Sequence, residues 1–346
     1  MKSSYKENDV ILLFKDISNM VIPEANEERE KKIQSGRHYS EMLPIEYEPT
    51  SDYLDIYKLA LKKHSKKTAM AVANVAEKIY EVKNRPVLVS LARAGTSTGI
   101  LIKHYLERKY HINVPHYSIS IIRDRGIDKN AMAYIIAREE ASSIQFVDGW
   151  TGKGVIQREL KAALKEYEGV SDKVAVLADP ASITDLCGTH DDFLIASSCL
   201  NATISGLISR TFLRSDIIGE NDFHGVMVYD NLAGVDHTYE FIDCVESYFD
   251  FNIKPQEEEK KDAKAEVEKI CEEFDITDIN LVKPSIGETT RVLLRRIPWK
   301  VLVYSLDDQE NLGHIYQLAK EKNVEVMLYP LKCYKAVGII KKLGDN

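Results

Sequence analysis

Short apolar runs alternate with helical stretches between residues 86 and 196, and this alternation constrains the fold more than any other feature. Helical patterns occupy about 97–109, 129–141 and 153–167. The apolar runs that we predict as strands are 86–91, 116–122, 144–147 and 173–178, with 193–196 as a candidate fifth. Strands that alternate with helices favour a parallel sheet covered on both faces. We therefore expect an α/β domain.

Polar or glycine-containing residues follow each of these predicted strands. They are Arg93-Ala94-Gly95, Arg123-Asp124-Arg125, Asp148 to Gly152, and Asp179. In open parallel sheets, ligands bind outside the carboxyl ends of the strands. The sequence therefore predicts a functional site at this edge of the sheet.

The chain is long enough for two domains, because it has 346 residues. Residues 254–262 are charged, include Pro255 and lack an apolar stretch, which is typical of a linker that leads into a short helix at about 262–275. We predict a larger domain at 1–253, a charged linker and helix at 254–276, and a smaller domain at 277–346.

Composition excludes several classes of protein. No apolar run approaches the roughly 18–20 residues that span a bilayer, and the first residues lack the apolar segment of a signal peptide. The five cysteines are scattered, with neither a disulfide framework nor metal-ligand spacing, and fit reduced thiols. We therefore expect a cytoplasmic protein with no membrane partner.

The segment from Asp148 to Gly154 carries the sharpest local pattern. An apolar strand leads into an acid, then into Gly149, Thr151, Gly152 and Lys153, and then into a helix. Small residues let backbone N–H groups surround a phosphate, and the helix adds its positive N-terminal end. The glycine spacing of a P-loop and the dinucleotide fingerprint are both absent. The alternative is a structural turn in which Asp148 caps the helix.

This segment resembles the phosphoribosyl pyrophosphate loop of the type I phosphoribosyltransferases. The resemblance implies that Asp148 holds the ribose hydroxyls and, with the substrate, a Mg²⁺ ion. It implies that the 5′-phosphate is bound by Gly149, Thr151, Gly152, Lys153 and Gly154. The family has a second acid where this chain has Gly149, and Asp179 is a candidate substitute.

The same resemblance assigns roles to two other segments. Arg93, Ala94, Gly95 and Thr96 stand where that family has its pyrophosphate loop, and an arginine can bind two phosphate oxygens at once. Arg123 and Arg125 stand where the family has a mobile loop that closes over the site. A capped helix start and a solvated charge cluster are the structural alternatives.

The chain as a whole resembles a bacterial family that joins this fold to a Pelota-like RNA-binding domain and occurs near tellurite-resistance genes. Its members are described as phosphoribosyltransferase-like or as StiP-type cysteine proteases. The segments that carry the resemblance are 35–44 (SGRHYSEMLP), 91–96 (LARAGT), 147–154 (VDGWTGKG) and 205–211 (SGLISRT).

A cysteine protease needs a nucleophilic thiol in contact with an oriented base. Cys187 and His190 are three residues apart, and Cys199 follows them. Spacing along the chain does not place a thiol against an imidazole. The alternative is that these cysteines are small buried hydrophobic residues.

The last 70 residues form a second predicted α/β unit, with helices at 288–296 and 315–322 and strands at 299–304 and 324–329. The order resembles the RNA-binding fold of Pelota and the kink-turn ribosomal proteins, although Gly287 replaces the usual asparagine before Glu288. The resemblance and the charge imply RNA contacts from Lys283, Gly287, Glu288, Arg291, Arg295, Lys332 and Lys335. A protein-docking domain is the alternative.

Together these patterns predict a Mg²⁺-assisted phosphoribosyltransferase that transfers ribose 5-phosphate from phosphoribosyl pyrophosphate to an unidentified acceptor, mainly by positioning and electrostatics. Asp148, Arg93, Arg123 and Arg125 would carry the reaction. A non-catalytic regulator that binds nucleotides and RNA, and a StiP-type cysteine protease, are the alternatives. Structured RNA is an expected partner, and the sequence leaves open whether the chain forms a homodimer.

Overall fold

The computed structural model describes residues 1–255 and 258–342. A six-stranded sheet with the order β1-β4-β3-β7-β8-β9 forms its centre, and every pair of neighbouring strands in it is parallel. The strands are β1 (Ile11–Leu12), β3 (Val87–Leu91), β4 (His116–Ile119), β7 (Ile144–Val147), β8 (Val174–Ala178) and β9 (Cys187–Thr189). The predicted α/β fold with a parallel sheet is therefore confirmed.

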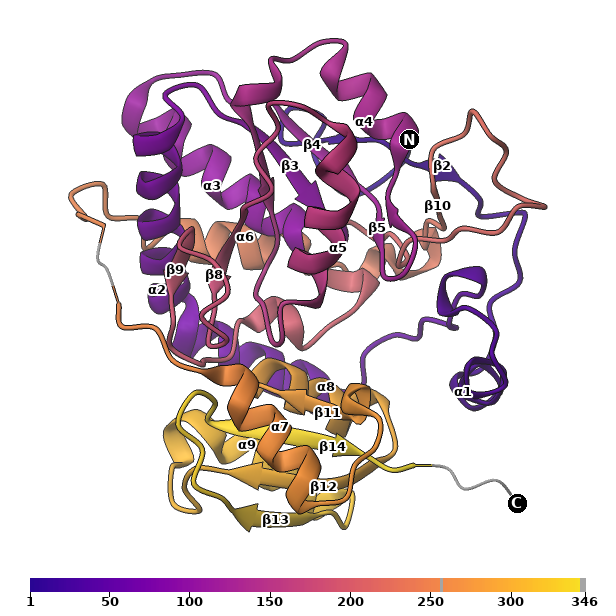
Figure 1. Ribbon diagram of the computed structural model, residues 1–346, viewed down its shortest axis with the longest axis vertical. Coiled ribbons are helices and arrows are strands. Elements are labelled where there is room, and N and C mark those ends of the chain that lie inside the picture. Colours follow the sequence, from indigo (N-terminus) through magenta and orange to yellow (C-terminus); the bar gives the residue numbers. More distant parts are fainter. Residues whose placement is uncertain (256–257, 343–346) are drawn as a thin grey trace.

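Helices cover both faces of this sheet (Figure 1). One face packs against α2 (Ser51–Val82), α3 (Ala94–Tyr110) and α6 (Thr238–Glu246), and the other against α4 (Lys129–Ile136) and α5 (Val155–Ala163). Successive side chains of a strand point to opposite faces. Thus Leu88 of β3 joins the core under α2 and α3, while Val87 and Val89 join the core under α4 and α5.

The prediction of a strand at 193–196 is wrong. These residues are buried, but the chain enters the 3-10 helix η4 (Ala196–Ser198) instead of pairing with the sheet. The edge position belongs to β9, which is short and contains a glycine. Smaller elements surround the sheet: α1 (Asn26–Gln34), the parallel pair β2 (Lys15–Asp16) and β10 (Gly225–Val226), and the hairpin β5 (Ile121–Ile122) and β6 (Gly126–Ile127).

The C-terminal part forms a second, smaller sheet with the order β11-β14-β12-β13. Its strands are β11 (Val282–Pro284), β12 (Pro298–Val303), β13 (Glu325–Leu328) and β14 (Ala336–Ile340). One face packs against α7 (Ala263–Glu273) and the other against α8 (Ile286–Arg295) and α9 (Gln309–Glu321). The helix expected in the linker, α7, therefore packs on the small sheet. The exact domain boundaries stay a prediction.

Helix α8 lies between the small sheet and the larger part of the molecule (Figure 1). Ser285 caps it by accepting a hydrogen bond from the backbone N–H of Glu288 at 3.2 Å. Its apolar side chains Ile286 and Leu293 share one buried cluster with Ile195 and Cys199. The apolar core therefore continues from one part of the molecule into the other. None of the helices in the described residues is both long and apolar enough to cross a bilayer.

Candidate active site

Cys187, His190 and Asp179 meet where β8 and β9 lie side by side. The two strands pair in parallel, with Val176 opposite Cys187 and Ala178 opposite Thr189. Asp179 follows β8 directly, and His190 follows β9 directly. The strand pairing therefore brings residues of two separate segments to one edge of the sheet.

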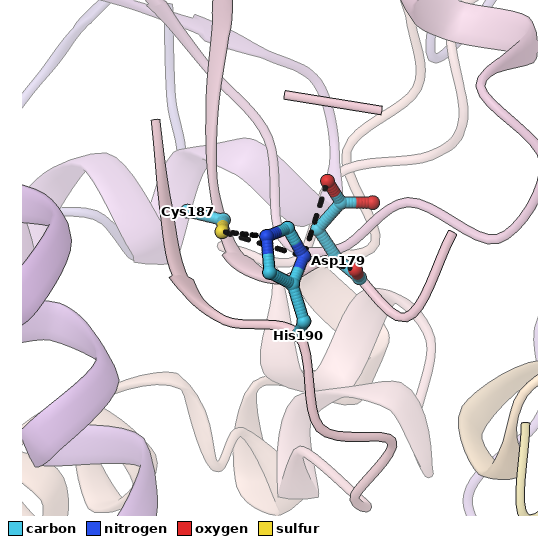
Figure 2. Close-up of side chains that lie close together, drawn as sticks. All are labelled: Asp179, Cys187 and His190. Atoms are coloured by element: carbon cyan, nitrogen blue, oxygen red, sulfur yellow. Dashed lines mark hydrogen bonds and ion pairs between the residues drawn. The ribbon is translucent and has the colours of Figure 1, made fainter. Parts of the chain in front are cut away.

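The three side chains are close enough to interact (Figure 2). Sγ of Cys187 lies 3.7 Å from both ring nitrogens of His190. Nδ1 of His190 lies 2.8 Å from the backbone carbonyl oxygen of Asp179 and 3.7 Å from its Oδ2. Because a carbonyl oxygen can only accept, Nδ1 carries the proton of the neutral ring and Nε2 keeps a free lone pair. The lone pair of Nε2 can therefore accept the thiol proton.

The cluster is buried, since the exposed fractions are 2% for Cys187, 8% for His190 and 0% for Asp179. Burial raises the pKa of the Cys187 thiol to about 12, although the nearby Lys78 ammonium opposes this shift. Burial also raises the pKa of the Asp179 carboxyl. The conformation therefore holds a neutral thiol beside an imidazole, and solvent access is needed to form the thiolate.

The segment that leads into the small domain forms hydrogen bonds and an ion pair at the edge of this cluster. A carboxylate oxygen of Glu258 accepts a hydrogen bond from the backbone N–H of His190 at 2.8 Å. Lys260 forms an ion pair with Asp185, and the backbone N–H of Lys261 donates to Ser182 Oγ at 3.1 Å. The segment therefore lies at the edge of the cluster, against His190 and the loop between β8 and β9.

No other cysteine in the described residues has its sulfur within hydrogen-bond distance of an imidazole. Cys199 is fully buried, and burial raises its pKa to about 12. Cys244 donates to Ser65 Oγ at 3.4 Å. The pairing with His190 therefore distinguishes Cys187 from the other thiols.

The loop predicted to bind a 5′-phosphate contacts the small domain instead. Nζ of Lys153 donates to the carbonyls of Ile279 and Val282 at 2.7 and 2.8 Å. The carbonyl of Gly152 accepts from the Tyr334 hydroxyl at 2.6 Å. Within the loop, Thr151 Oγ1 accepts from the backbone N–H of Gly154 at 3.2 Å. The groups expected to hold a phosphate are thus engaged in docking and in local turn structure.

Asp148 lies beside the same interface. Its Oδ1 accepts a hydrogen bond from the backbone N–H of Gly149 at 2.7 Å. Burial raises its pKa to about 7, against the opposing effects of that hydrogen bond and of Arg291. The magnesium ion predicted at Asp148 stays a prediction.

The segment predicted to hold pyrophosphate begins α3. The guanidinium of Arg93 lies 3.2 Å from Glu46 Oε1, 3.2 Å from the Ile208 carbonyl and 3.1 Å from Asn201 Oδ1. Ala94 is the first residue of α3, and a Cβ on Gly95 would lie only 2.4 Å from the Val147 carbonyl. Thr96 Oγ1 bonds with Ser118 Oγ at 2.8 Å. Gly95 and Thr96 therefore hold the start of α3 against β7 and β4, while Arg93 is bound by Glu46, Ile208 and Asn201.

The predicted closing loop forms the β5–β6 hairpin, which is attached to the N-terminal segment. Arg125 forms an ion pair with Glu41 and donates to the Leu213 carbonyl at 3.0 Å. The backbone N–H of Arg123 donates to the Tyr39 hydroxyl at 2.8 Å, and its side chain pairs with Asp124 at 3.3 Å. Both arginines therefore have partners within the chain.

Most of the residues predicted to contact RNA lie at the interface between the two parts of the chain. The Arg291 guanidinium lies 5.0 Å from the centre of the Trp150 ring and pairs with Glu288 at 3.3 Å. Gly287 lies beside Trp150 and Ser198, and the Arg295 side chain donates to the Ser198 carbonyl at 3.4 Å. The Lys335 ammonium lies 2.9 Å from the Asp191 carboxylate. Lys283 is partly buried in β11. Of the seven predicted residues, Lys332 is the exposed one.

Sequence reasoning identified all three members of the buried cluster but did not group them. The sequence makes Asp179 a candidate for ribose binding because it ends a strand, and it offers Cys187 and His190 three residues apart without establishing that they touch. The signal that could have joined them is the shortness of the connection, since only residues 180–186 separate Asp179 from Cys187 and let β9 return beside β8. That pairing depends on the tertiary structure and leaves no local motif.

Two families match separate parts of the chain. Residues 3–246 match the family described as tellurite-like stress resistance cysteine protease StiP, and residues 261–342 match the PELOTA RNA binding domain. The chain is also 37% identical to the cysteine protease StiP of Acinetobacter baylyi (strain ATCC 33305 / BD413 / ADP1), in an alignment that covers 99% of this chain and 95% of that relative.

These similarities overturn the predicted phosphoribosyltransferase activity, because the matching family and the relative are both described as cysteine proteases. Phosphoribosyl pyrophosphate likewise finds no support as a partner. The prediction failed because a small-residue loop with a lysine is a local pattern, and here Gly152 and Lys153 contact the small domain. By its family match and by its full-length relative, the chain belongs to the StiP family of tellurite-like stress resistance cysteine proteases.

Proposed function

We propose that this chain is a cysteine protease in which Cys187 is the nucleophile, His190 is the base and Asp179 orients His190. The observation that carries the proposal is the 3.7 Å contact between Cys187 Sγ and His190 Nε2, with Nδ1 held by the Asp179 carbonyl at 2.8 Å. Membership of the StiP family supports the class of reaction.

In this reaction Nε2 of His190 takes the thiol proton, and Sγ of Cys187 attacks the carbonyl carbon of a peptide bond. The protonated ring then gives its proton to the leaving amine, and water hydrolyses the resulting thioester. Asp179 Oδ2, at 3.7 Å from Nδ1, stabilises the positive charge of the ring. The thiol is 2% exposed, so the reaction requires a conformation in which the cluster is open to substrate.

The proposal is tested by incubating the full-length protein with casein and measuring the release of new amino termini. We expect Cys187→Ala to lower the rate by about 10³-fold or more, because removal of a nucleophile leaves only binding contributions. Cys271→Ala is the matched control, since Cys271 lies in α7 and far along the chain from the cluster. Undiminished cleavage by Cys187→Ala would contradict the assignment.

We further propose that residues 261–342 bind RNA, on the strength of their match to the PELOTA RNA binding domain. The phosphoribosyltransferase type of fold is proposed for residues 1–253, and the parallel order of β4, β3, β7 and β8 supports it. A cytoplasmic location is likewise a proposal, which the five unpaired cysteines support.

A further inference from the structure

The Asp179, Cys187 and His190 cluster offers a sulfur, an imidazole nitrogen and a carboxylate oxygen within 4.8 Å of one another. Within residues 1–255 and 258–342, no other three His, Cys, Asp or Glu side chains lie close enough together to hold a metal ion. Mixed thiolate, imidazole and carboxylate ligands are the set that Zn²⁺ binds in proteins. The chemistry of the donors therefore fits a thiophilic divalent cation.

The spacing of the donors also fits. A tetrahedral Zn²⁺ with bonds of about 2.3 Å to sulfur and about 2.0 Å to nitrogen places these two ligand atoms about 3.5 Å apart. Nδ1 of His190 lies 3.7 Å from Sγ of Cys187 and 3.7 Å from Oδ2 of Asp179, so this nitrogen is the ring atom that can share one ion with both neighbours. Figure 2 shows a carboxylate oxygen of Asp179 joined to this ring nitrogen by a dashed line.

The surroundings of the cluster resemble those of a bound metal. Nδ1 of His190 also lies 2.8 Å from the Asp179 carbonyl, so binding of an ion at Nδ1 moves the ring proton to Nε2 and replaces this hydrogen bond. Oδ2 of Asp179 accepts from the backbone N–H of Thr184 at 2.8 Å, but Oδ1 is buried without a hydrogen-bond partner. A buried carboxylate oxygen without a partner is costly, and a cation would satisfy it.

Charge leads to the same conclusion. A thiolate and a carboxylate in a buried site carry two negative charges that burial disfavours. One Zn²⁺ ion neutralises both. The nearest lysines have other partners, because Lys78 donates to the Cys187 carbonyl at 3.0 Å and Lys260 pairs with Asp185.

We infer that Asp179, Cys187 and His190 bind one Zn²⁺ ion and that this ion inhibits the nucleophile; the inhibitory part rests on the proposed protease function. Binding forms an S–Zn bond as the thiol proton leaves to solvent, and no electron is transferred. The ion occupies the Sγ electron pair that would attack a substrate, and with the ring proton on Nε2 the imidazole can no longer accept the thiol proton there. Three protein ligands leave the fourth position of the ion for water.

The test is a titration of the metal-free full-length protein with Co²⁺, which reports thiolate ligation through a charge-transfer absorption band in the near ultraviolet. We expect one Co²⁺ per chain, displacement by Zn²⁺, and a loss of affinity on the order of 100-fold or more in Cys187→Ser and in His190→Ala. Cys333→Ser, in which another buried thiol is replaced, should bind as the wild type does.

A second measurement needs no variant. Zn²⁺ should protect Cys187 of the wild-type protein from alkylation by iodoacetamide, as seen in the mass of its peptide. Absence of the thiolate band in the wild type, or unchanged affinity in folded Cys187→Ser, would overturn the metal site. Metal binding at Cys187 without casein cleavage by the metal-free protein would overturn the protease and its inhibition and leave the ion site standing. Cleavage that depends on Cys187 without metal binding would overturn this inference alone.

Discussion

At the scale of single residues, Gly188 allows β9 to lie directly against α2. A Cβ at Gly188 would be 2.3 Å from the Ala71 carbonyl oxygen, and backbone cannot move aside as a flexible side chain can. We therefore expect Gly188→Ala to lower the free energy of unfolding by about 1–3 kcal/mol in urea denaturation. Gly234→Ala is the control, because a Cβ there meets nothing within 4 Å. Equal effects of the two substitutions would contradict this packing.

His104 makes stability depend on pH. Burial alone would lower its pKa, but the carboxylates of Glu246 and Asp9 outweigh burial and raise it. Its Nε2 lies 2.9 Å from Asp9 Oδ1. A raised pKa in the folded state means that the stabilisation is complete below the unfolded value of about 6.5 and is lost as the pH rises through the folded value.

We therefore expect the stability advantage of the wild type over His104→Gln to shrink as the pH rises from about 6 to about 9. Urea denaturation at a series of pH values measures this difference. An advantage that stays constant or grows with pH would show that the His104 charge does not stabilise the fold.

The candidate site shows which features can be predicted from local sequence and which cannot. The i,i+3 spacing of Cys187 and His190 makes them candidates but does not establish a contact, which the structure provides by placing their atoms 3.7 Å apart. The same reasoning assigned Asp179 another role, because its contact with His190 depends on the pairing of β8 with β9. Burial of the thiol could not be predicted either, since Cys187 packs with side chains of β8 and α5 in the core on the sheet face opposite α2.

At the scale of elements, Asp192 fastens the start of α8 to the larger part of the molecule. Its carboxylate accepts hydrogen bonds from the backbone N–H of Ile286 at 3.0 and 3.1 Å and of Lys335 at 2.9 Å. Asp192→Ala leaves both buried donors without partners, so we expect a loss of about 3 kcal/mol in the free energy of unfolding. Thermal or urea denaturation measures this loss.

The neighbouring Asp191→Ala is the matched control for that change. Asp191 forms ion pairs with Lys67 and Lys335 near the surface, where such pairs contribute at most about 1 kcal/mol. If the two alanine variants were equally stable, Asp192 would not be the anchor of α8.

The elements themselves were predicted where the sequence carries a local signal. The apolar runs predicted as strands at 86–91, 144–147 and 173–178 form β3, β7 and β8. Residues 193–196 are as apolar but do not pair, because β9 already occupies that edge of the sheet.

The loop from Thr151 to Lys153 has the composition of a phosphate-binding loop. Its partners in the small domain lie more than 100 residues further along the chain, so no local pattern could reveal these contacts.

At the scale of the whole molecule, the predicted RNA-binding face of α8 is covered by the larger part of the chain. Trp150 supports this contact, since the Arg291 guanidinium lies over its ring. RNA bound through this face must separate the two parts. We therefore expect Trp150→Ala to raise the affinity for a structured RNA by about 3- to 10-fold, which is the range of one lost cation–π contact. Fluorescence anisotropy measures the affinity.

Trp299→Ala is the control for this experiment, because Trp299 is partly exposed on β12, away from the interface. A loss of affinity in Trp299→Ala, with no change in Trp150→Ala, would show that RNA uses the outer face of the small domain and would contradict the proposed competition.

The measurement that tests the central claim most directly is the identification of the cysteine that a thiol-directed, substrate-like protease inhibitor modifies in the full-length protein. We predict a single adduct at Cys187, found by peptide mass, that forms much more slowly in His190→Ala because the thiol then lacks its base. Modification of Cys199 or of another cysteine, or labelling of Cys187 at the same rate in His190→Ala, would contradict the assignment of the catalytic pair.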